Sequence, residues 1–270
     1  MKMDNNQKIT FAGVIYKRAI SSLDRNKIWE IIHSTPKEET KLLAIVDLLK
    51  LGDFSVKTEL IKMMMESSDC KIRLLCCRIF CCIANHSDCS LFRAYLENIL
   101  ERGDEAELKD FVLCSQYTLS PEILPYLLAL LSEWEGSEIE EKVRIVLGEL
   151  FPFINFLSED VSVNMIEEIF AEKISLIDKE IYFYHGEPSF PGVWTKELLE
   201  RAIDARWQGD VLRQTFTPSI LSLWSGEVCP AFFLTKIDDD MIGNLHTYVK
   251  QIAFTKWDKG CKYFYGHKIK

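Results

Sequence analysis

Apolar residues recur at helical spacing along most of this chain, and breakers divide them into helix-length segments. Between about residues 11 and 175, the apolar positions follow a period of about 3.6 residues rather than the alternation of a β-strand. The segment Lys37–Leu51, for example, carries Leu42, Ile45 and Leu49 on one face and stops at Gly52. Further helices are predicted over residues 56–67, 71–84, 90–102, 104–119, 120–134, 138–151 and 159–174. The chain is therefore predicted to be all-α over this part.

Two of these segments have clear start signals. Thr35 and Pro36 predict an N-cap and a first-turn proline, and Glu38 completes a capping box. Ser120 and Pro121 repeat the cap and the proline.

Basic residues recur near the starts of four predicted helices. Lys41, Arg73, Lys109 and Arg144 follow one another at intervals of 32, 36 and 35 residues. A helical hairpin that repeats at such intervals buries its apolar face only against neighbouring copies, and stacked copies form an α-solenoid. The alternative is an irregular all-α bundle in which the spacing is coincidence.

Two of the copies resemble a known repeat. The segments Asp69–Arg73 and Glu140–Arg144 are similar to the D-x-x-V-R opening of the second helix of a HEAT repeat. The copies at Lys41 and Lys109 depart from that pattern, and the period is shorter than usual. The resemblance covers roughly residues 36–175 and implies a HEAT-like, right-handed α-solenoid of helical hairpins.

The character of the chain changes after residue 180. Residues 181–194 are rich in proline, glycine and aromatic residues, which predicts a rigid connector. Helices are predicted over 195–207, 217–224 and 239–254, and residues 262–265 are expected to form a short strand or an ordered extension. We therefore predict HEAT-like helical repeats over residues 1–180 and an aromatic-rich, C-terminal helical cap over residues 181–270.

The negative charge is concentrated in one segment. The chain has 41 acidic and 32 basic residues and a net charge of −9. Residues 133–180 alone hold 13 acidic and four basic residues, so the rest of the chain is neutral overall. Binding to nucleic acid is not expected, because it depends on Lys and Arg. A localised negative field attracts a basic protein partner, although a solvated helix face is the simpler interpretation. The candidate partner-binding residues are Glu138, Glu141, Glu159, Asp160, Glu167, Glu168, Glu172, Trp194 and Trp207.

The cysteines and the catalytic motifs limit the function further. Six of the nine cysteines fall between Cys70 and Cys89, a spacing that favours reduced, apolar helix residues and excludes paired zinc knuckles. We expect no cofactor, no metal and no enzymatic activity, since the sequence contains no hydrolase G-x-S-x-G, P-loop, G-x-G-x-x-G or H-E-x-x-H motif. With neither a signal peptide nor a membrane-length apolar run, a cytoplasmic protein that does not bind membranes is expected.

In its size, its acidity and its expected location, the chain resembles a bacterial immunity protein of a polymorphic toxin system. The resemblance implies non-enzymatic binding that neutralises a cognate toxin domain. Two alternatives stay open: a HEAT-like nucleic-acid-processing enzyme that uses the aromatic C-terminal third, and a scaffold subunit of a larger assembly. The oligomeric state is left open.

Overall fold

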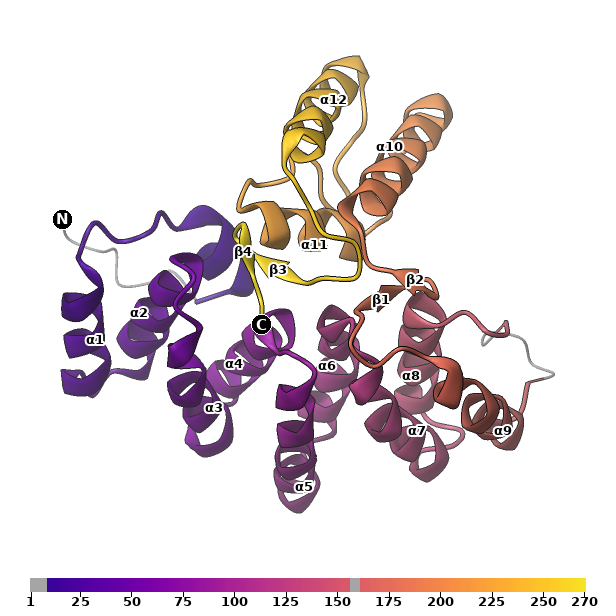
Figure 1. Ribbon diagram of the computed structural model, residues 1–270, viewed down its shortest axis with the longest axis horizontal. Helices are drawn as coiled ribbons and strands as arrows, with labels where there is room; N and C mark the ends of the chain where they lie inside the picture. Colours follow the sequence, from indigo (N-terminus) through magenta and orange to yellow (C-terminus); the bar gives the residue numbers. More distant parts are fainter. Residues whose placement is uncertain (1–8, 156–160) are drawn as a thin grey trace. The chain divides into compact units, whose positions relative to one another are not determined.

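The computed structural model describes residues 9–155 and 161–270, and most of these residues are in helices (Figure 1). The all-α prediction is confirmed at this level, apart from two short β-hairpins. The chain divides into two compact units, residues 1–80 and 81–270, and each is described by itself. The boundary predicted at residue 180 lies inside the second unit, and separate folding of residues 181–270 stays a prediction.

The first unit is built around α2. In chain order its elements are the π-helix η1 (Gly13–Lys17), α1 (Arg25–Ser34), α2 (Glu38–Lys50), η2 (Phe54–Val56), α3 (Lys57–Glu66) and most of α4 (Cys70–Ile83). Both α1 and α3 pack against α2. The apolar face predicted for α2, with Leu42, Ile45 and Leu49, is completely buried, so this helix supplies the core of the unit.

A buried lysine ties α2 to the start of the chain. Lys50 is 3% exposed, and its ammonium group donates hydrogen bonds to the carbonyls of Val14 (3.1 Å), Ile15 (2.7 Å) and Arg18 (2.9 Å). Burial, reinforced by the charge of Arg18, lowers the pKa of Lys50 to about 8.

The second unit begins with paired helices. Its first elements are η3 (Ser87–Leu91), α5 (Phe92–Arg102), α6 (Glu105–Ser115), η4 (Gln116–Thr118), η5 (Pro121–Ile123), α7 (Leu124–Glu133), α8 (Glu138–Leu150), α9 (Val163–Lys173) and η6 (Ile174–Leu176). Helix α5 packs against α6, α6 and α7 pack against α8, and α9 packs against α7. Each of these helices thus packs against one that is one or two helices away along the chain.

The rest of the second unit alternates hairpins with helices. It contains β1 (Phe183–Tyr184), β2 (Glu187–Pro188), α10 (Pro191–Gln208), α11 (Phe216–Ser225), α12 (Asp239–Phe254), β3 (Tyr263–Phe264) and β4 (His267–Lys268). Helix α10 packs against α11 and α12, and Figure 1 shows α10 and α12 side by side. The prediction of a connector over residues 181–194 is wrong: this segment forms the β1–β2 hairpin and then the first turn of α10. The short strand predicted near the C-terminus is confirmed as β3.

The start signals had mixed outcomes. Ser120 caps the turn at Pro121 by accepting a hydrogen bond from the Glu122 backbone nitrogen (3.2 Å), as predicted. The capping box at Thr35 is wrong, because α2 begins at Glu38 with Lys37 as its N-cap. The Glu38 carboxylate instead accepts a hydrogen bond from the Ser67 hydroxyl (2.7 Å). A contact distant in sequence therefore replaces the local one.

The recurring basic residues bond to the element next to their own helix. Lys41 of α2 pairs with Glu59 of α3 (2.5 Å), and Lys109 of α6 pairs with Glu138 of α8 (2.7 Å). The guanidinium of Arg144 donates to the Val161 carbonyl (2.9 Å), ahead of α9. Arg73, likewise, donates to the Ser67 carbonyl before α4 (3.0 Å). The sequence repeat therefore corresponds to a repeated role, which is to tie successive elements together.

The two β-hairpins cap the ends of two helices in the same way. In the β1–β2 turn, the backbone nitrogens of His185 and Gly186 donate to the Glu149 and Leu150 carbonyls of α8 (both 2.9 Å). In the β3–β4 turn, the nitrogens of Tyr265 and Gly266 donate to the Leu223 and Trp224 carbonyls of α11 (both 2.7 Å). Both turns place a non-glycine residue and then a glycine at positive φ, as two-residue hairpin turns require. Carbonyls that a helix end leaves unpaired are thereby satisfied.

Lys262, the residue before β3, is completely buried. Its ammonium group donates to the carbonyls of Cys81 (2.8 Å), Ala84 (2.9 Å) and Thr118 (3.1 Å). Cys81 is in the last turn of α4, so a positive charge lies where the helix dipole favours it. The C-terminal hairpin is therefore fastened to the end of α4 and to η4, both within the second unit.

Candidate partner-binding site

A cavity of about 380 Å³ lies along one face of α10, and we call it the α10 pocket. Its lining is formed by Glu149, Glu197, Arg201, Asp204, Ala205, Gln208, Asp210, Val211, Arg213 and Gln214. Helix α10 starts at Pro191, where the ring suits the first turn, and ends at Gly209 in the left-handed conformation. Within the helix, Glu197, Arg201, Asp204 and Gln208 are three or four residues apart and so share a face.

Glu197 is held in place by two neutral donors. The hydroxyl of Tyr184 donates to one of its oxygens (2.9 Å), and the side-chain amide of Gln214 donates to the other. Burial, with the nearby charges of Glu149 and Glu197, raises the pKa of Tyr184 far above its usual value. Tyr184 therefore keeps its proton and remains a donor, and Glu197 keeps a fixed position in the wall.

His185 links the β1–β2 turn to the end of α8. One imidazole nitrogen lies 2.9 Å from a carboxylate oxygen of Glu149. This hydrogen bond, more than the opposing effect of burial, raises the pKa of His185. As pH falls, the imidazole gains charge and offsets one of the carboxylates of the pocket.

The charge of the lining is negative overall. Four carboxylates face two guanidiniums, and Arg213 is paired with Asp210 (3.1 Å). The hydrogen bond from Arg213 lowers the pKa of Asp210, which keeps this carboxylate ionised. A concave site with excess carboxylates attracts cations and suits a guanidinium or ammonium group of a partner.

Trp207 is on α10, one residue before the pocket residue Gln208, and is 82% exposed. Such exposure is unusual for a residue of this size, and Trp is enriched among residues that dominate binding energy. Trp194 is on the same helix but has no exposed surface, and its ring packs edge-on against Trp224 at 4.5 Å. Trp194 thus belongs to the core and offers no surface to a partner.

Comparison with known families decides the general role. The model of the family Immunity protein 47 matches residues 12–269. The chain belongs to the Immunity protein 47 family. No curated protein and no solved structure matches it. An immunity-protein role is therefore shown, and the family name implies that the partner is a toxin. Immunity proteins are in general non-enzymatic, in line with the absence of a recognisable catalytic motif in the sequence.

The acidic residues predicted for this immunity protein lie on two other helices. Glu138 and Glu141 are exposed on α8, and α9 carries Glu167, Glu168 and Glu172. Glu138 lies between Lys109 (2.7 Å) and Lys142 (2.6 Å), whose hydrogen bonds lower its pKa to about 2. Much of its charge is thus compensated within the protein. Glu159 and Asp160 lie outside the described residues.

The structure does not gather these predicted residues at the α10 pocket. Of the predicted set, Trp194 and Trp207 are on the helix that forms one wall of the pocket; the pocket carboxylates Glu149, Glu197, Asp204 and Asp210 were not in that set. A sequence signal for two of these carboxylates existed, since Glu197 and Asp204 share a helical face with Arg201. The contributions of Glu149 and Asp210 depend on the tertiary fold.

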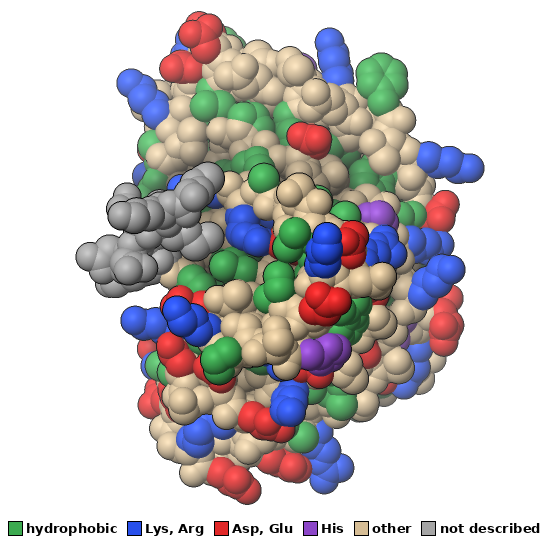
Figure 2. Space-filling view, turned by 90° about the vertical axis from the view of Figure 1, so that its left-hand side faces the viewer, with side chains coloured by type: hydrophobic (Ala, Val, Ile, Leu, Met, Phe, Trp, Pro, Cys, Tyr) green, Lys and Arg blue, Asp and Glu red, His purple; other side chains and the backbone are tan. Residues whose placement is uncertain are grey.

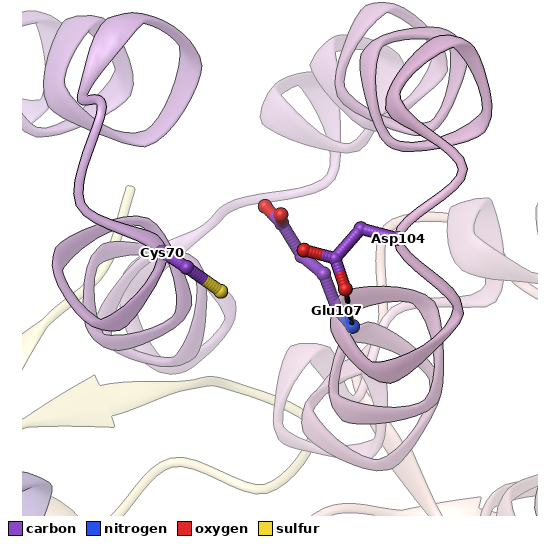
Figure 3. Close-up of side chains that lie close together, drawn as sticks. All are labelled: Cys70, Asp104 and Glu107. Carbon is purple, nitrogen blue, oxygen red and sulfur yellow. Dashed lines mark hydrogen bonds between the residues drawn. The ribbon is translucent and has the colours of Figure 1, made fainter.

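Other charged groups have structural roles. Figure 3 shows the Asp104 carboxylate accepting a hydrogen bond from the Glu107 backbone nitrogen (3.0 Å), which caps α6. The buried Glu107 carboxylate accepts from the hydroxyl of Tyr95 (2.8 Å) and from Arg102 (3.0 Å). On the face drawn in Figure 2, acidic and basic side chains are interspersed, with hydrophobic ones between them. That view therefore offers no surface of one charge.

A second cavity, of about 620 Å³, is lined by the segment Asn85–Ser90, by Lys179–Tyr182 ahead of β1, and by residues just before β3 and at the end of the chain. Its charged lining mixes Lys179, Lys268 and Lys270 with Glu122 and Glu180. Lys179 and Glu122 are paired at 3.3 Å. The mixed charge gives this cavity no clear preference for a basic partner, so the α10 pocket is the stronger candidate.

The thiols and the lengths of the helices bear on two further expectations, reduced cysteines and the absence of membrane spans. The cysteines of the described residues are free thiols, and Cys76, Cys77, Cys81, Cys82, Cys89 and Cys229 are buried. Burial raises the pKa of Cys89 to about 11, so this thiol is protonated and unreactive near neutral pH. Among the described residues, the helices are too short or too polar to cross a bilayer.

Proposed function

We propose that this immunity protein neutralises a cognate bacterial toxin by binding it directly, and that the α10 pocket receives a basic region of the toxin. The observation that carries the proposal is the excess of carboxylates in a cavity along α10, the helix that also bears the exposed Trp207. Within an immunity family, such a surface has an obvious use, because the partner is a protein and not a small substrate.

The charge of the pocket affects mainly the rate of association and the choice of partner. A negative concave surface steers a basic protein toward it, and salt weakens this effect. A guanidinium of the toxin that enters the pocket can form hydrogen bonds with Asp204 and with Glu149, whose side chains line it. Inhibition would then be stoichiometric, with no chemical step on the immunity protein.

The proposal includes the scaffold and the location. We propose that residues 36–175 form a HEAT-like, right-handed solenoid, supported by the repeated ties of Lys41, Lys109 and Arg144 to neighbouring elements. The protein would act in the cytoplasm, where a toxin that enters or is made in the cell reaches its target.

The test is calorimetric and kinetic binding of the purified protein to the toxin domain encoded by the neighbouring gene. Two double variants each remove two negative charges: Glu149→Gln with Asp204→Asn in the pocket, and Glu141→Gln with Glu168→Asn on α8 and α9. The pocket variant should associate roughly tenfold more slowly and lose part of its salt dependence, whereas the α8–α9 variant should bind like the wild type.

The outcomes separate the role from the site. Failure of the wild-type protein to bind or inhibit the toxin would contradict direct neutralisation. If the wild type binds and only the α8–α9 variant is impaired, the site is the acidic segment predicted from the sequence and not the α10 pocket.

A further inference from the structure

Helices α10 and α12 run antiparallel, and an ion pair ties them at one end. The guanidinium of Arg206, near the end of α10, makes two hydrogen bonds (2.8 and 3.0 Å) with the carboxylate of Asp239, the first residue of α12. The exposed Trp207 follows Arg206 in the sequence of α10. The loops that leave α10 and lead to α12 are joined by a β-bridge between Val211 and Lys236.

The loop that leads to α12 contains a tight turn with two exposed apolar residues. The backbone nitrogen of Thr235 donates to the Phe232 carbonyl (2.9 Å), so Phe233 and Leu234 are the central residues of the turn. The Thr235 hydroxyl accepts from the Phe232 nitrogen (3.0 Å), and the Leu234 nitrogen donates to the Leu212 carbonyl (2.9 Å). Phe233 is 51% exposed and Leu234 is 59% exposed.

Leu234 adopts a backbone conformation that leucine avoids. Its φ is +67°, and it occupies the turn position at which a positive φ favours glycine or asparagine. The Cβ atom of any residue other than glycine destabilises this conformation, because it comes too close to the following carbonyl oxygen. Burial does not compensate for this cost, since more than half of the side chain stays in water. The choice of leucine therefore has no explanation in folding and points to an intermolecular contact.

The charges around this turn indicate the chemistry of the partner. Arg206 and Arg213 are paired with Asp239 and Asp210. Three further carboxylates, those of Asp204, Asp238 and Asp240, are exposed within two residues of this Arg206–Asp239 pair in the sequence, and Lys236 is exposed in the loop ahead of α12. The rim is thus acidic, as is the neighbouring α10 pocket.

We propose that Trp207, Phe233 and Leu234, the apolar tip, insert into an apolar cleft of the toxin whose rim is basic. This inference rests on the proposed function, because it assigns the apolar half of the contact whose charged half is the α10 pocket. The strained turn keeps the two side chains presented before binding, which reduces the ordering cost of association. The acidic rim excludes partners with acidic clefts.

The experiment measures the affinity of four single variants for the toxin domain encoded by the neighbouring gene. Trp207→Ala, Phe233→Ala and Leu234→Gly should each weaken binding by roughly tenfold or more, as truncation of an anchor residue does. Phe254→Ala is the matched control: Phe254 is an aromatic residue with 90% exposure at the opposite end of α12. This variant should bind like the wild type.

Leu234→Gly separates binding from folding. Glycine adopts the left-handed conformation without strain, so this variant should resist urea at least as well as the wild type while it loses affinity. If the wild type binds and the three tip variants bind as tightly as Phe254→Ala, the apolar tip is not the contact, and the proposed function stands. A tip variant that changes the oligomeric state in light scattering, with unaltered toxin affinity, would assign the tip to a second copy of the chain and overturn the inference.

Discussion

Replacement of Lys262 by methionine tests how the C-terminal hairpin is fastened to the second unit. Methionine has a similar length and can occupy the same buried space, but it cannot donate a hydrogen bond. The variant would leave the carbonyls of Cys81, Ala84 and Thr118 without the ammonium group that lies 2.8, 2.9 and 3.1 Å away. We expect a less stable protein even though an apolar residue replaces a buried charge.

The expected magnitude follows from the number of acceptors. A buried acceptor that loses its partner destabilises the folded state by about 1–3 kcal/mol. With the lower figure for each of the three carbonyls, the loss is about 3 kcal/mol. The Cys81 carbonyl is in the last turn of α4 and Ala84 directly follows this helix, where the lost positive charge also opposed the negative end of the helix dipole. The loss is a large part of the total stability of a typical domain, which is about 5–15 kcal/mol.

Urea denaturation followed by far-UV circular dichroism measures this loss, and amide hydrogen exchange in β3 and β4 locates it. The control is Lys268→Met in the same hairpin, which removes an exposed ion pair with Asp258 (3.0 Å). The control should unfold at nearly the urea concentration of the wild type. If Lys262→Met is within about 1 kcal/mol of the wild type, the three hydrogen bonds do not have the stabilising role argued here.

Exchange of His185 for glutamine should remove a pH-dependent contribution to stability. The hydrogen bond to Glu149 raises the pKa of His185 in the folded protein. The contribution of His185 to stability is therefore complete below the pKa of the unfolded chain, about 6.5, and is lost as pH rises through the higher pKa of the folded protein. Urea titrations at several pH values would measure this loss. Trp194→Ala should destabilise the protein by about 3–5 kcal/mol because Trp194 is fully buried, whereas Trp207→Ala should change stability by less than about 0.5 kcal/mol, both measured by thermal unfolding. Burial lowers the pKa of Lys50 in the folded protein to about 8, below its usual value of 10.5, so the stability of the wild type relative to Lys50→Met should rise between these two pH values; a difference that does not change with pH would contradict this.

Helix positions were predictable where a local signal decides them. Local capping signals of this kind are found at three helix ends in the structure. Ser120 and Asp238 accept hydrogen bonds from backbone nitrogens at the starts of η5 and α12, and Gly209 ends α10 by donating to carbonyls of its last turn. Thr35 and Glu38 carry an equally good local signal, yet Glu38 accepts from Ser67 instead. A partner 29 residues away competes with the capping box, and nothing in the local pattern reveals that partner.

The candidate site was predictable only in part. The sequence could not predict that Trp207 is exposed and Trp194 is buried, because both are tryptophans of one helix. Their difference depends on α11, whose Trp224 covers Trp194. In the sequence, acidic residues and arginines alternate in α10, and residues 181–230 have a net charge of only −2. The fold changes that balance, because it adds Glu149 from α8 and Asp210 from a loop to the same cavity.

The two hairpins show which residues of the first one serve the pocket. Both turns cap a helix through the backbone nitrogens of the residue before the glycine and of the glycine itself. Where the first hairpin has Tyr184 and His185, the second has Phe264 and Tyr265. Capping therefore requires neither the hydroxyl nor the imidazole. In the first hairpin those two groups bond to Glu197 and Glu149, carboxylates of the α10 pocket. The polar side chains of the first turn are thus explained by the pocket and not by the hairpin, which is an argument internal to this chain that the α10 pocket has a function.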